Sequence, residues 1–366
     1  MMLATFYRKF GGPSVDEVGQ LPKPTKDDLV PGKLLLKVHA SSLNPADYKQ
    51  RSGGVTRFLV KQKFPMVYGF DFVGTVVGTP KGAESGFSDS DVVFGMVKGL
   101  NRGSLAEYMI VDEEICVLKP ENVKDIDAAS VPLVGITAVK AFRKCGLREY
   151  DPSEKKPRVL VTGGAGGVGS CAIQLAKHLY NASFVATTAS PGAKTELVKR
   201  LGADHVVNYR EESIEEVFKD EPPFDAIFDC VGDVYKTLSV LAPGGGVVSI
   251  DTAPTAESVM EWVEESGVTA VVPGVKGFLG SSIGAAIFNR LSGATKIRNI
   301  LAKKNGIYNS VIGTGNGRIM TILAKEMEND RLTGVIDTVY PLKDGLKAIA
   351  HIESGRTAGK IVLIVE

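Results

Sequence analysis

The sequence contains few of the residues that disulfide frameworks, metal centres and membrane-spanning segments require. Its 366 residues include only four cysteines and four histidines. The cysteines are scattered without a C-x-x-C pair, at positions Cys116, Cys145, Cys171 and Cys230. This spacing argues against a disulfide framework and favours a reducing compartment. No apolar run approaches the roughly 18 residues of a transmembrane helix, so we expect no membrane span.

The chain also lacks an excess of charge of either sign. Lys and Arg together number 43 and Asp and Glu 42, so no net field would attract nucleic acid. With 44% hydrophobic and 23% charged residues, the composition is that of a folded protein, and the length suffices for two domains. The first residues lack the apolar core of a signal peptide. We therefore expect a cytoplasmic protein, or one that enters an organelle without a recognisable cleaved presequence.

The pattern of apolar residues changes at about residue 133. Before this point, short β-rich runs are separated by Gly and Pro, which predicts a mainly β portion. After it, apolar strands alternate with helical patterns, which predicts an α/β fold with a parallel sheet covered on both faces. The expected strands are 34–40, 72–77, 159–162, 184–187, 205–207, 226–229, 247–250, 335–339 and 360–365, and the expected helices are 168–179, 193–201, 258–265, 318–328 and 346–352. The rest of 256–312 shows only a Gly-rich apolar stretch from 271 to about 302.

A glycine-rich motif follows the predicted strand 159–162. Residues 163–169 read Gly-Gly-Ala-Gly-Gly-Val-Gly, in which Gly164, Gly166 and Gly169 satisfy G-x-G-x-x-G. Glycine permits a tight turn and a close approach of pyrophosphate to backbone N–H groups, and the next helix offers its N-terminal donors. The strand–turn–helix–strand context makes this motif more specific than an isolated one. It predicts a dinucleotide site that includes Gly167 and Val168; the alternative is a turn that binds nothing.

The end of the second strand indicates which dinucleotide is bound. NAD-specific sites usually place Asp or Glu about 20 residues after the motif begins, where the acid accepts hydrogen bonds from the adenosine ribose. Residues 184–190 contain no acid, Ser190 can donate a hydrogen bond, and Lys194 can pair with a 2′-phosphate. NADPH is therefore the expected cofactor. The alternative is that Lys194 is one more solvated helix residue.

Six segments distributed along nearly the whole chain form a set that is specific when taken together. They are Ser41-Ser42-Leu43-Asn44-Pro45-Ala46-Asp47-Tyr48-Lys49, Pro65-Met66-Val67-Tyr68-Gly69-Phe70-Asp71-Phe72-Val73-Gly74, Val131-Pro132-Leu133-Val134-Gly135-Ile136-Thr137-Ala138, the glycine motif, Leu201-Gly202-Ala203-Asp204-His205-Val206-Val207-Asn208-Tyr209 and Gly359-Lys360-Ile361-Val362. In this set the chain resembles the medium-chain dehydrogenase/reductase superfamily, on its zinc-independent quinone oxidoreductase branch. Within that branch it is most similar to chloroplast-envelope quinone oxidoreductase homologues and alkenal/enone reductases.

The resemblance implies a GroES-like β domain (1–132 and 313–366), a Rossmann domain with a doubly wound parallel sheet (133–312), and an active site in the cleft between them. It assigns Ser190, Lys194 and Tyr209 to the adenosine 2′-phosphate and Thr137 to the nicotinamide end, and Lys360 joins the expected cofactor-binding residues. It also implies a homodimer. The expected substrates are small enones, alkenals or quinones.

Zinc-dependent relatives hold their metal with Cys, a His before an acid, and a further Cys or acid. The matching positions here lie near Asp47, at Phe70 and near Gly135, and the four-cysteine structural lobe is absent between Gly95 and Glu107. Phenylalanine cannot ligate a metal, and the four histidines have no ligand spacing. We therefore expect no metal.

Reduction of an enone without a metal requires a hydride, stabilisation of the enolate oxygen and a proton. We expect Asn44, Asp47 and Lys49 to form the polar cluster at the nicotinamide, where Asn44 and Lys49 donate hydrogen bonds and Asp47 orients Lys49. Each residue also has a structural interpretation, as a turn, a helix cap and a solvated cation respectively. Many relatives carry a tyrosine shortly after this run, but residues 51–58 contain none, so the proton donor is open.

Other functions compete with this assignment. Gly280-Ser281-Ser282-Ile283-Gly284 fits G-x-S-x-G, but a nucleophile elbow needs a buried strand directly before it. Residues 271–304 combine apolar residues at helical spacing with cations, which is typical of a packed helix and compatible with peripheral membrane contact. An enoyl-thioester reductase and a non-catalytic protein that binds NADPH are further alternatives.

Overall fold

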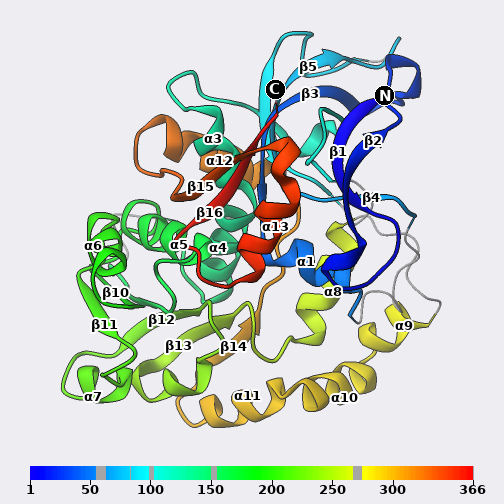
Figure 1. Cartoon of the computed structure of the whole chain (residues 1–366). Helices are drawn as coiled ribbons and strands as arrows, with labels where there is room; N and C mark the ends of the chain where they lie inside the picture. Colours follow the sequence, from blue (N-terminus) through cyan, green and yellow to red (C-terminus); the bar gives the residue numbers. More distant parts are fainter. Residues whose placement is uncertain (55–62, 83, 99–102, 150–154, 267–273, 366) are drawn as a thin grey trace. The chain divides into compact units, whose positions relative to one another are not determined.

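The computed structural model describes residues 1–54, 63–82, 84–98, 103–149, 155–266 and 274–365. The chain divides into two compact units, which Figure 1 shows with the labels used below. Unit 1 comprises the described residues of 1–136, 263–272 and 314–366, and unit 2 those of 137–262 and 273–313. The domain boundaries implied by the resemblance differ slightly, because residues 133–136 and the stretch from residue 263 are grouped with unit 1.

Unit 1 is built from both ends of the chain. Its strands are β1 (Met2–Tyr7), β2 (Asp16–Leu21), β3 (Lys33–Leu43), β4 (Met66–Val67), β5 (Asp71–Gly78), β6 (Val92–Met96), β7 (Tyr108–Asp112), β8 (Cys116–Leu118), β15 (Ile336–Pro341) and β16 (Lys360–Ile364). Its helices are α1 (Pro45–Ser52), α3 (Asp125–Ser130), α12 (Gly317–Glu328) and α13 (Gly345–Glu353). The larger sheet has the strand order β15-β16-β3-β5-β6-β8, with β7 also paired to β3, and a smaller sheet has the order β2-β1-β4.

The long strand β3 organises unit 1 because it pairs with three others. Its first half is antiparallel to β7, and it runs antiparallel to β5 over most of its length. The C-terminal strand β16 pairs with the end of β3, where Ile361 lies opposite Leu43. Apolar side chains of β3 and its neighbours, such as Leu34, Leu36 and Phe72, form the core. This pairing brings the beginning of β16 next to the chain that follows β3.

Unit 2 is a six-stranded parallel sheet with helices on both faces. Its strands are β9 (Arg158–Val161), β10 (Phe184–Ala189), β11 (His205–Asn208), β12 (Phe224–Asp229), β13 (Leu241–Ser249) and β14 (Ile307–Ser310), in the order β11-β10-β9-β12-β13-β14. The helices are α4 (Pro132–Lys144), of which residues from 137 onward belong to this unit, α5 (Gly167–His178), α6 (Ala193–Arg200), α7 (Ile214–Phe218), α8 (Ala256–Glu265), α9 (Val275–Gly280), α10 (Ser282–Ser292) and α11 (Ala294–Ala302). This is a doubly wound Rossmann sheet.

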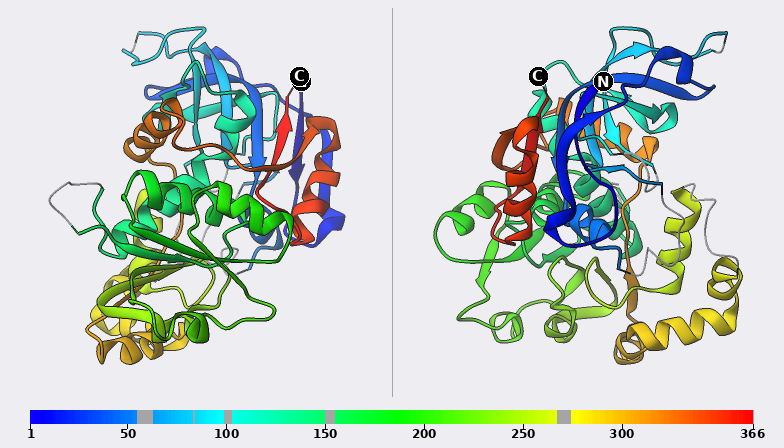
Figure 2. Two further views of the ribbon diagram at one scale, coloured as in Figure 1. Left: turned by 90° about the vertical axis from the view of Figure 1, so that its left-hand side faces the viewer. Right: turned by 45° about the vertical axis from the view of Figure 1, so that its right-hand side comes forward.

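The two faces of this sheet are covered by different helices. Figures 1 and 2 show α5 and α6 on one face and α7 and α11 on the other. On the second face, Phe218 of α7 and Ile297 and Leu301 of α11 pack against strand residues such as Leu160 and Ile227. The strands are short, apolar runs buried on both sides, which is the pattern that predicted a parallel sheet.

The structure confirms the predicted strands and helices, with bounds that shift by a few residues. Within 271–304, where the helical spacing indicated a packed helix, the structure has α9, α10 and α11, and it adds the edge strand β14, which the sequence did not indicate. It also adds α1 and α3 to the mainly β first third. None of the helices in the part of the chain that the structure describes combines the length and the apolar character needed to cross a bilayer.

Candidate functional site

The glycine-rich segment forms the turn between β9 and α5. Gly163 adopts a positive φ of 67°, and its N–H donates to Thr188 Oγ1 (2.8 Å) at the end of the neighbouring strand β10. The Gly166 N–H then donates to the Gly163 carbonyl (3.0 Å), which closes the turn. A Cβ on Gly164 would overlap the Thr187 hydroxyl, and a Cβ on Gly169 would overlap the Gly163 carbonyl. Both positions therefore require glycine.

The turn leads into the N-terminus of α5, where Gly166 is the N-cap and the helix begins with Gly167, Val168 and Gly169. The first N–H groups of a helix have no intrahelical acceptor and carry partial positive charge. Gly166, Gly167 and Val168 are half-buried rather than enclosed. Bare backbone next to such donors is the donor set that fits the pyrophosphate of a dinucleotide.

Ser190, Lys194 and Tyr209 lie near the ends of two adjacent strands. Strands β10 and β11 are parallel with Ala189 opposite Asn208, so Ser190 and Tyr209 each follow a residue of the last pair. Lys194 is in the first turn of α6, and Thr195 Oγ1 donates to the Ser190 carbonyl (3.1 Å). Ser190 and Lys194 are half-buried and Tyr209 is exposed. The sheet therefore brings two of the three predicted side chains to one edge, with the third four residues farther on.

Two polar residues at this edge of unit 2 were not singled out from the sequence. Arg210 adds a second cation beside the ring of Tyr209, with 5.9 Å between its guanidinium carbon and the ring centroid. Asp229, at the end of β12, is fully buried and accepts from Thr162 Oγ1 and Ser249 Oγ, each at 2.8 Å. Asp229 thus connects the ends of β9, β12 and β13. An acid at the end of an otherwise apolar strand was the available signal for this role.

A second polar cluster lies in unit 1 around Asp71, the first residue of β5. One carboxylate oxygen, Oδ2, accepts from Ser42 Oγ (2.6 Å) and Asn44 Nδ2 (2.9 Å) and pairs with Lys360 Nζ (3.1 Å). The other oxygen accepts from the Leu133 N–H (2.7 Å). Lys360 also donates to Asn44 Oδ1. These bonds join four segments that are far apart in the sequence.

Because this cluster is buried, its charges would destabilise the fold if any of their partners were missing. The side chains of Asp71 and Lys360 are 0% and 5% exposed, and Asn44 is also buried. A buried charge is tolerated only when it is paired and hydrogen-bonded, and Asp71 meets both conditions. Lys360, expected among the cofactor-binding residues, therefore has two partners within unit 1. An amide NH2 carries two hydrogens, so Asn44 retains one after its bond to Asp71.

Asp47 and Asn44 cap the start of α1 reciprocally. The Asn44 N–H donates to Asp47 Oδ2 (2.8 Å) in a capping box, and the Asp47 N–H donates to the backbone carbonyl of Asn44 (2.9 Å). The other oxygen, Asp47 Oδ1, accepts from the N–H of Gly69 (2.7 Å). Burial raises the pKa of Asp47 to about 7, and the two backbone bonds and the charge of Lys360 act against this increase. Backbone groups thus take both oxygens, and the predicted orientation of Lys49 by Asp47 has no support in these bonds.

The positions of Lys49, Thr137 and two further residues are also clear. Lys49 is exposed on α1, one turn from its C-terminus, whereas Thr137 of α4 is buried. Tyr68, which lies near this run, is buried and donates to Asp16 Oδ1 (2.5 Å). Ser282 of the G-x-S-x-G segment begins α10 directly after α9, so no strand precedes it and the nucleophile-elbow interpretation fails.

Comparison with known proteins places this geometry in a family. Residues 30–121 match the alcohol dehydrogenase GroES-like domain, and residues 201–363 match the zinc-binding dehydrogenase family. The chain is 31% identical to the 2-methylene-furan-3-one reductase of Solanum lycopersicum, over 99% of this chain and 79% of that protein. The chain belongs to the medium-chain dehydrogenase/reductase superfamily. Oxidoreductases of this superfamily bind a nicotinamide cofactor, which agrees with the glycine-rich turn.

Other members of the superfamily have similar names. The chloroplastic NADPH-dependent alkenal/one oxidoreductase of Arabidopsis thaliana is 38% identical over 69% of this chain and 64% of that protein. The chloroplast envelope quinone oxidoreductase homolog of the same plant is 35% identical over 70% of this chain and 77% of that protein. The solved structure of the quinone oxidoreductase from Coxiella burnetii is 27% identical, with a TM-score of 0.75 over 100% of this chain and 99% of that one. These similarities confirm the predicted superfamily and its fold.

The name of one matching family refers to zinc, so the residues at the expected ligand positions matter. Phe70 packs against the apolar core of unit 1. At Gly135 a Cβ would come within 2.6 Å of Leu323, which leaves no room for a larger side chain. Among the described residues, His, Cys, Asp and Glu form no group of three or more that could hold a metal ion. The donor set for a zinc site is thus missing from this part of the chain.

Proposed function

We propose that this protein is a zinc-independent reductase that uses NADPH to reduce small α,β-unsaturated carbonyl compounds, such as alkenals and enones, or quinones. The observation that carries the proposal is the cation-bearing edge formed by Ser190, Lys194 and Tyr209 beside the glycine-rich turn. A 2′-phosphate would find a hydroxyl and an ammonium group there, and the strand end lacks the acid that would repel it. The names of the plant relatives support the same cofactor and substrate classes.

In this proposal the glycine-rich turn binds the pyrophosphate. Its backbone N–H groups and the start of α5 supply donors, and the absence of side chains at Gly164 and Gly169 permits close approach. Asp229 is a positioning residue, because it fixes the ends of three strands at the edge where the cofactor binds. When bound, NADPH supplies the hydride.

In this proposal, side chains of unit 1 stabilise the negative charge that develops on the substrate. We assign Lys49 to donate to the carbonyl oxygen as negative charge develops, because its ammonium group is on an exposed surface of α1. Asn44 and Asp47 act by positioning: their capping box sets the start of α1, and the Asp71–Lys360 pair orients the Asn44 amide. We keep the assignment of Thr137 to the nicotinamide end of the cofactor.

The first experiment follows the absorbance of the reduced nicotinamide after the purified protein is mixed with NADPH or NADH. The substrates are 4-hydroxynonenal, 3-penten-2-one, 9,10-phenanthrenequinone and crotonyl-CoA. We expect turnover of the alkenal or enone with NADPH and little with NADH. Turnover confined to quinones or to crotonyl-CoA would replace the proposed substrate class. Binding of NADPH without turnover would favour the non-catalytic alternative.

The cofactor assignment has a matched control on the same helix. Removing one charge-assisted hydrogen bond to a phosphate costs about 1.5–3 kcal/mol, and partial exposure reduces this. Lys194→Ala should therefore raise the KM for NADPH by about five- to tenfold and leave the KM for NADH unchanged. Lys199→Ala removes an exposed lysine five residues later that pairs with Glu196 (3.7 Å), and it should change neither value. An equal loss for both cofactors would contradict the 2′-phosphate role.

The homodimer, the cytoplasmic location and contact with a membrane surface remain separate predictions. None of them supports the proposed reaction, and relatives named for chloroplasts and mitochondria differ in compartment.

A further inference from the structure

Helix α10 has the reverse of the usual amphipathic arrangement. Ile283, Ile287 and Leu291 recur at intervals of four residues, and 75%, 44% and 83% of their surfaces are exposed. On the other side of the helix, Asn289 is buried. We call Ile283, Ile287, Leu291 and the exposed Arg290 between them the α10 face. A soluble helix normally buries its large apolar residues, so a face of this kind indicates a surface with a partner.

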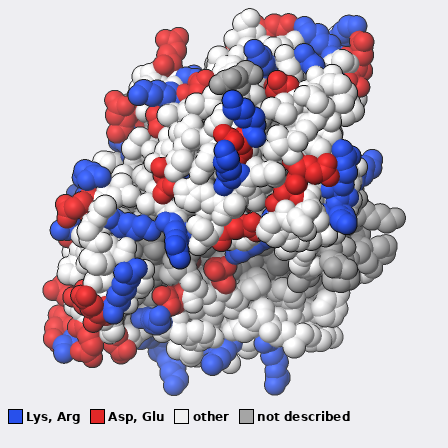
Figure 3. All heavy atoms as spheres, in the orientation of Figure 1, with Lys and Arg blue, Asp and Glu red and all other residues white. Residues whose placement is uncertain are grey.

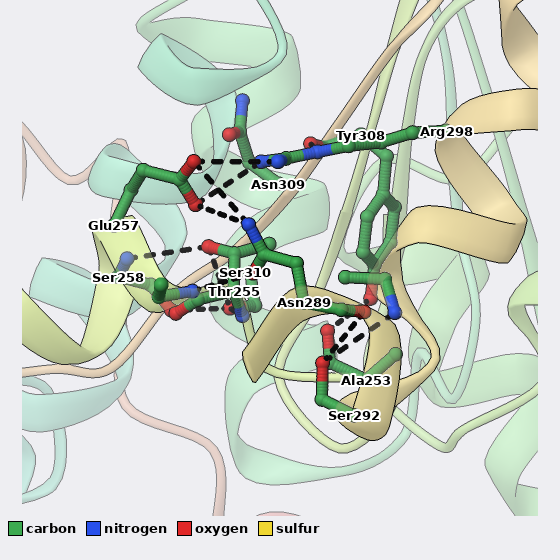
Figure 4. A network of polar contacts seen from close by, with 12 residues as sticks. Ala253, Thr255, Glu257, Ser258, Asn289, Ser292, Arg298, Tyr308, Asn309 and Ser310 are labelled. Carbon is green, nitrogen blue, oxygen red and sulfur yellow. Dashed lines mark hydrogen bonds and ion pairs between the residues drawn. The ribbon is translucent and has the colours of Figure 1, made fainter. Parts of the chain in front are cut away.

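Hydrogen bonds to the buried side fix the rotation of α10. Asn289 Oδ1 accepts from the N–H of Ala256 (2.7 Å), and Asn289 Nδ2 donates to the carboxylate of Glu257 (3.4 Å) at the start of α8. Arg298 of α11 donates to both oxygens of Glu257, at 3.3 and 3.2 Å. Figure 4 shows these side chains converging between the three helices. Rotating α10 to bury the apolar residues would break these bonds and leave buried polar groups without partners.

The same network continues to the edge strand of the sheet. Ser310 Oγ, at the end of β14, accepts from the N–H of Thr255 (2.9 Å), and Ser258 of α8 is bonded to Ser310 as well (Figure 4). Helices α8, α10 and α11 are therefore fixed to one another and to the sheet. The exposure of the α10 face is a property of the folded unit rather than of a loosely attached helix.

The charged residues of the segment that carries this face are all basic. From Ser266 to Lys325 the sequence contains no Asp or Glu. Within this stretch, Lys276, Arg290 and Lys303 are exposed. Figure 3 shows Lys and Arg side chains projecting from the lower edge of the molecule, where Figure 1 places α10 and α11. An apolar strip with cations beside it is complementary to an anionic lipid surface, which offers acyl chains and phosphate groups together.

We propose that the α10 face docks unit 2 on a bilayer that contains anionic phospholipids. The helix lies parallel to the membrane plane, Ile283, Ile287 and Leu291 enter the boundary between headgroups and acyl chains, and Arg290 pairs with lipid phosphate. A second copy of this chain fits the face less well. A two-fold contact through this face would set the basic segment 266–325 of one copy against the same segment of the other, which contains no acid.

Sedimentation with vesicles tests this proposal on the full-length protein. One set of vesicles contains phosphatidylcholine alone, and in the other about a third of the lipid is phosphatidylglycerol. We expect wild-type protein to sediment with the anionic vesicles, less so as salt rises, and to stay in solution with the neutral ones. The double variant Ile283→Ser, Leu291→Ser should bind at least about tenfold more weakly, because it lacks two apolar side chains that enter the bilayer. Leu346→Ser, at an exposed leucine of α13 in unit 1, is the control and should bind as wild type does.

Further measurements separate the possible results. Circular dichroism melting should show that the double variant is folded, since both positions are exposed, and turnover of a water-soluble substrate should be unchanged. An Ile283→Trp variant should shift its emission to shorter wavelength with anionic vesicles, even if the double variant is unstable. Wild-type protein that remains in solution with both vesicles, or a double variant that binds like wild type, would overturn the proposal. Light scattering that shows a dimer for wild type and a monomer for the double variant would assign the face to a second copy instead.

Discussion

Replacing Lys360 by methionine tests whether the Asp71 cluster holds unit 1 together. The lysine and the aspartate are 289 positions apart in the sequence, and their charged atoms are 3.1 Å apart and almost completely buried. Methionine has a similar length and no charge, so the substitution keeps the packing and removes the cation. Asp71 would then be a buried carboxylate with three donors, from Ser42, Asn44 and Leu133, and no countercharge.

The expected size of the effect follows from the burial. Removing one partner of a buried ion pair costs about 3–5 kcal/mol, and the three remaining donors place this case near the lower limit, at about 3 kcal/mol. For a domain of this size each kcal/mol lowers the melting temperature by about 2–4 °C, so we expect a decrease of about 6–12 °C. In the double variant Asp71→Asn, Lys360→Met both charges are gone. It should regain part of the loss, with a coupling energy of about 2 kcal/mol.

Urea unfolding followed by circular dichroism measures these values for the wild type, the two single variants and the double variant. Lys347→Met is the control, because Lys347 is an exposed lysine that pairs with Asp344 (2.8 Å) and its loss should leave the urea midpoint nearly unchanged. A Lys360→Met variant within about 1 kcal/mol of wild type would refute the reasoning, and so would single-variant effects that simply add.

Three further predictions concern the turn and two carboxyl groups. Gly169→Ala should abolish NADPH binding or unfold unit 2, because its Cβ would overlap the Gly163 carbonyl, whereas in Gly166→Ala the nearest atom is 3.4 Å away and binding titrations should show a much smaller loss. The pKa of Asp47 is raised to about 7 by burial, so its neutral form favours folding; the stability it contributes is present at low pH and lost as pH rises through about 7. Asp47→Asn should therefore flatten the decline in urea midpoint between pH 5 and 8, and an unchanged slope would contradict the raised pKa. The pKa of Asp125 is lowered, first by its hydrogen bond with His39, so its stabilisation is lost as pH falls below the ordinary value of 3.8. Asp125→Asn should thus lower the urea midpoint at pH 7 and have less effect near pH 3, and equal effects at both would be inconsistent with this bond.

The sequence predicted those parts of the fold that depend on local patterns. Strands β9, β10 and β12 are apolar runs bounded by turn formers, and the glycine motif could be placed between a strand and a helix. The edge strand β14 was missed because its residues, Ile-Tyr-Asn-Ser, include two polar side chains and are too few to show a period. It is a strand because β13 supplies hydrogen-bonding partners along its whole length, a tertiary effect.

The candidate site was predictable to different extents in the two units. In unit 2 the residues predicted for the pyrophosphate and the 2′-phosphate all lie between Gly164 and Tyr209, so strand order and register were sufficient to bring them near one edge. In unit 1 the polar cluster is built on the pair of Asp71 and Lys360, and no periodicity relates residues so distant in sequence. The role predicted for the run from Asn44 to Lys49 stays a prediction, and Asp47 accepts from two backbone N–H groups, one of which is presented only by the folded loop at Gly69.

The pairing of β16 with β3 has a consequence for how the protein is made. All of unit 2 lies between the first and last parts of unit 1 in the sequence, so a ribosome completes the Rossmann sheet before it has synthesised the strand that β3 requires at one side. Until then the carboxylate of Asp71 has no cation beside it, and the first 136 residues wait with an open sheet. Such non-local closure is slow, because a long chain must be brought back before any contact rewards it. During synthesis, this nascent first part is therefore where the chain is most exposed to aggregation and most in need of a chaperone.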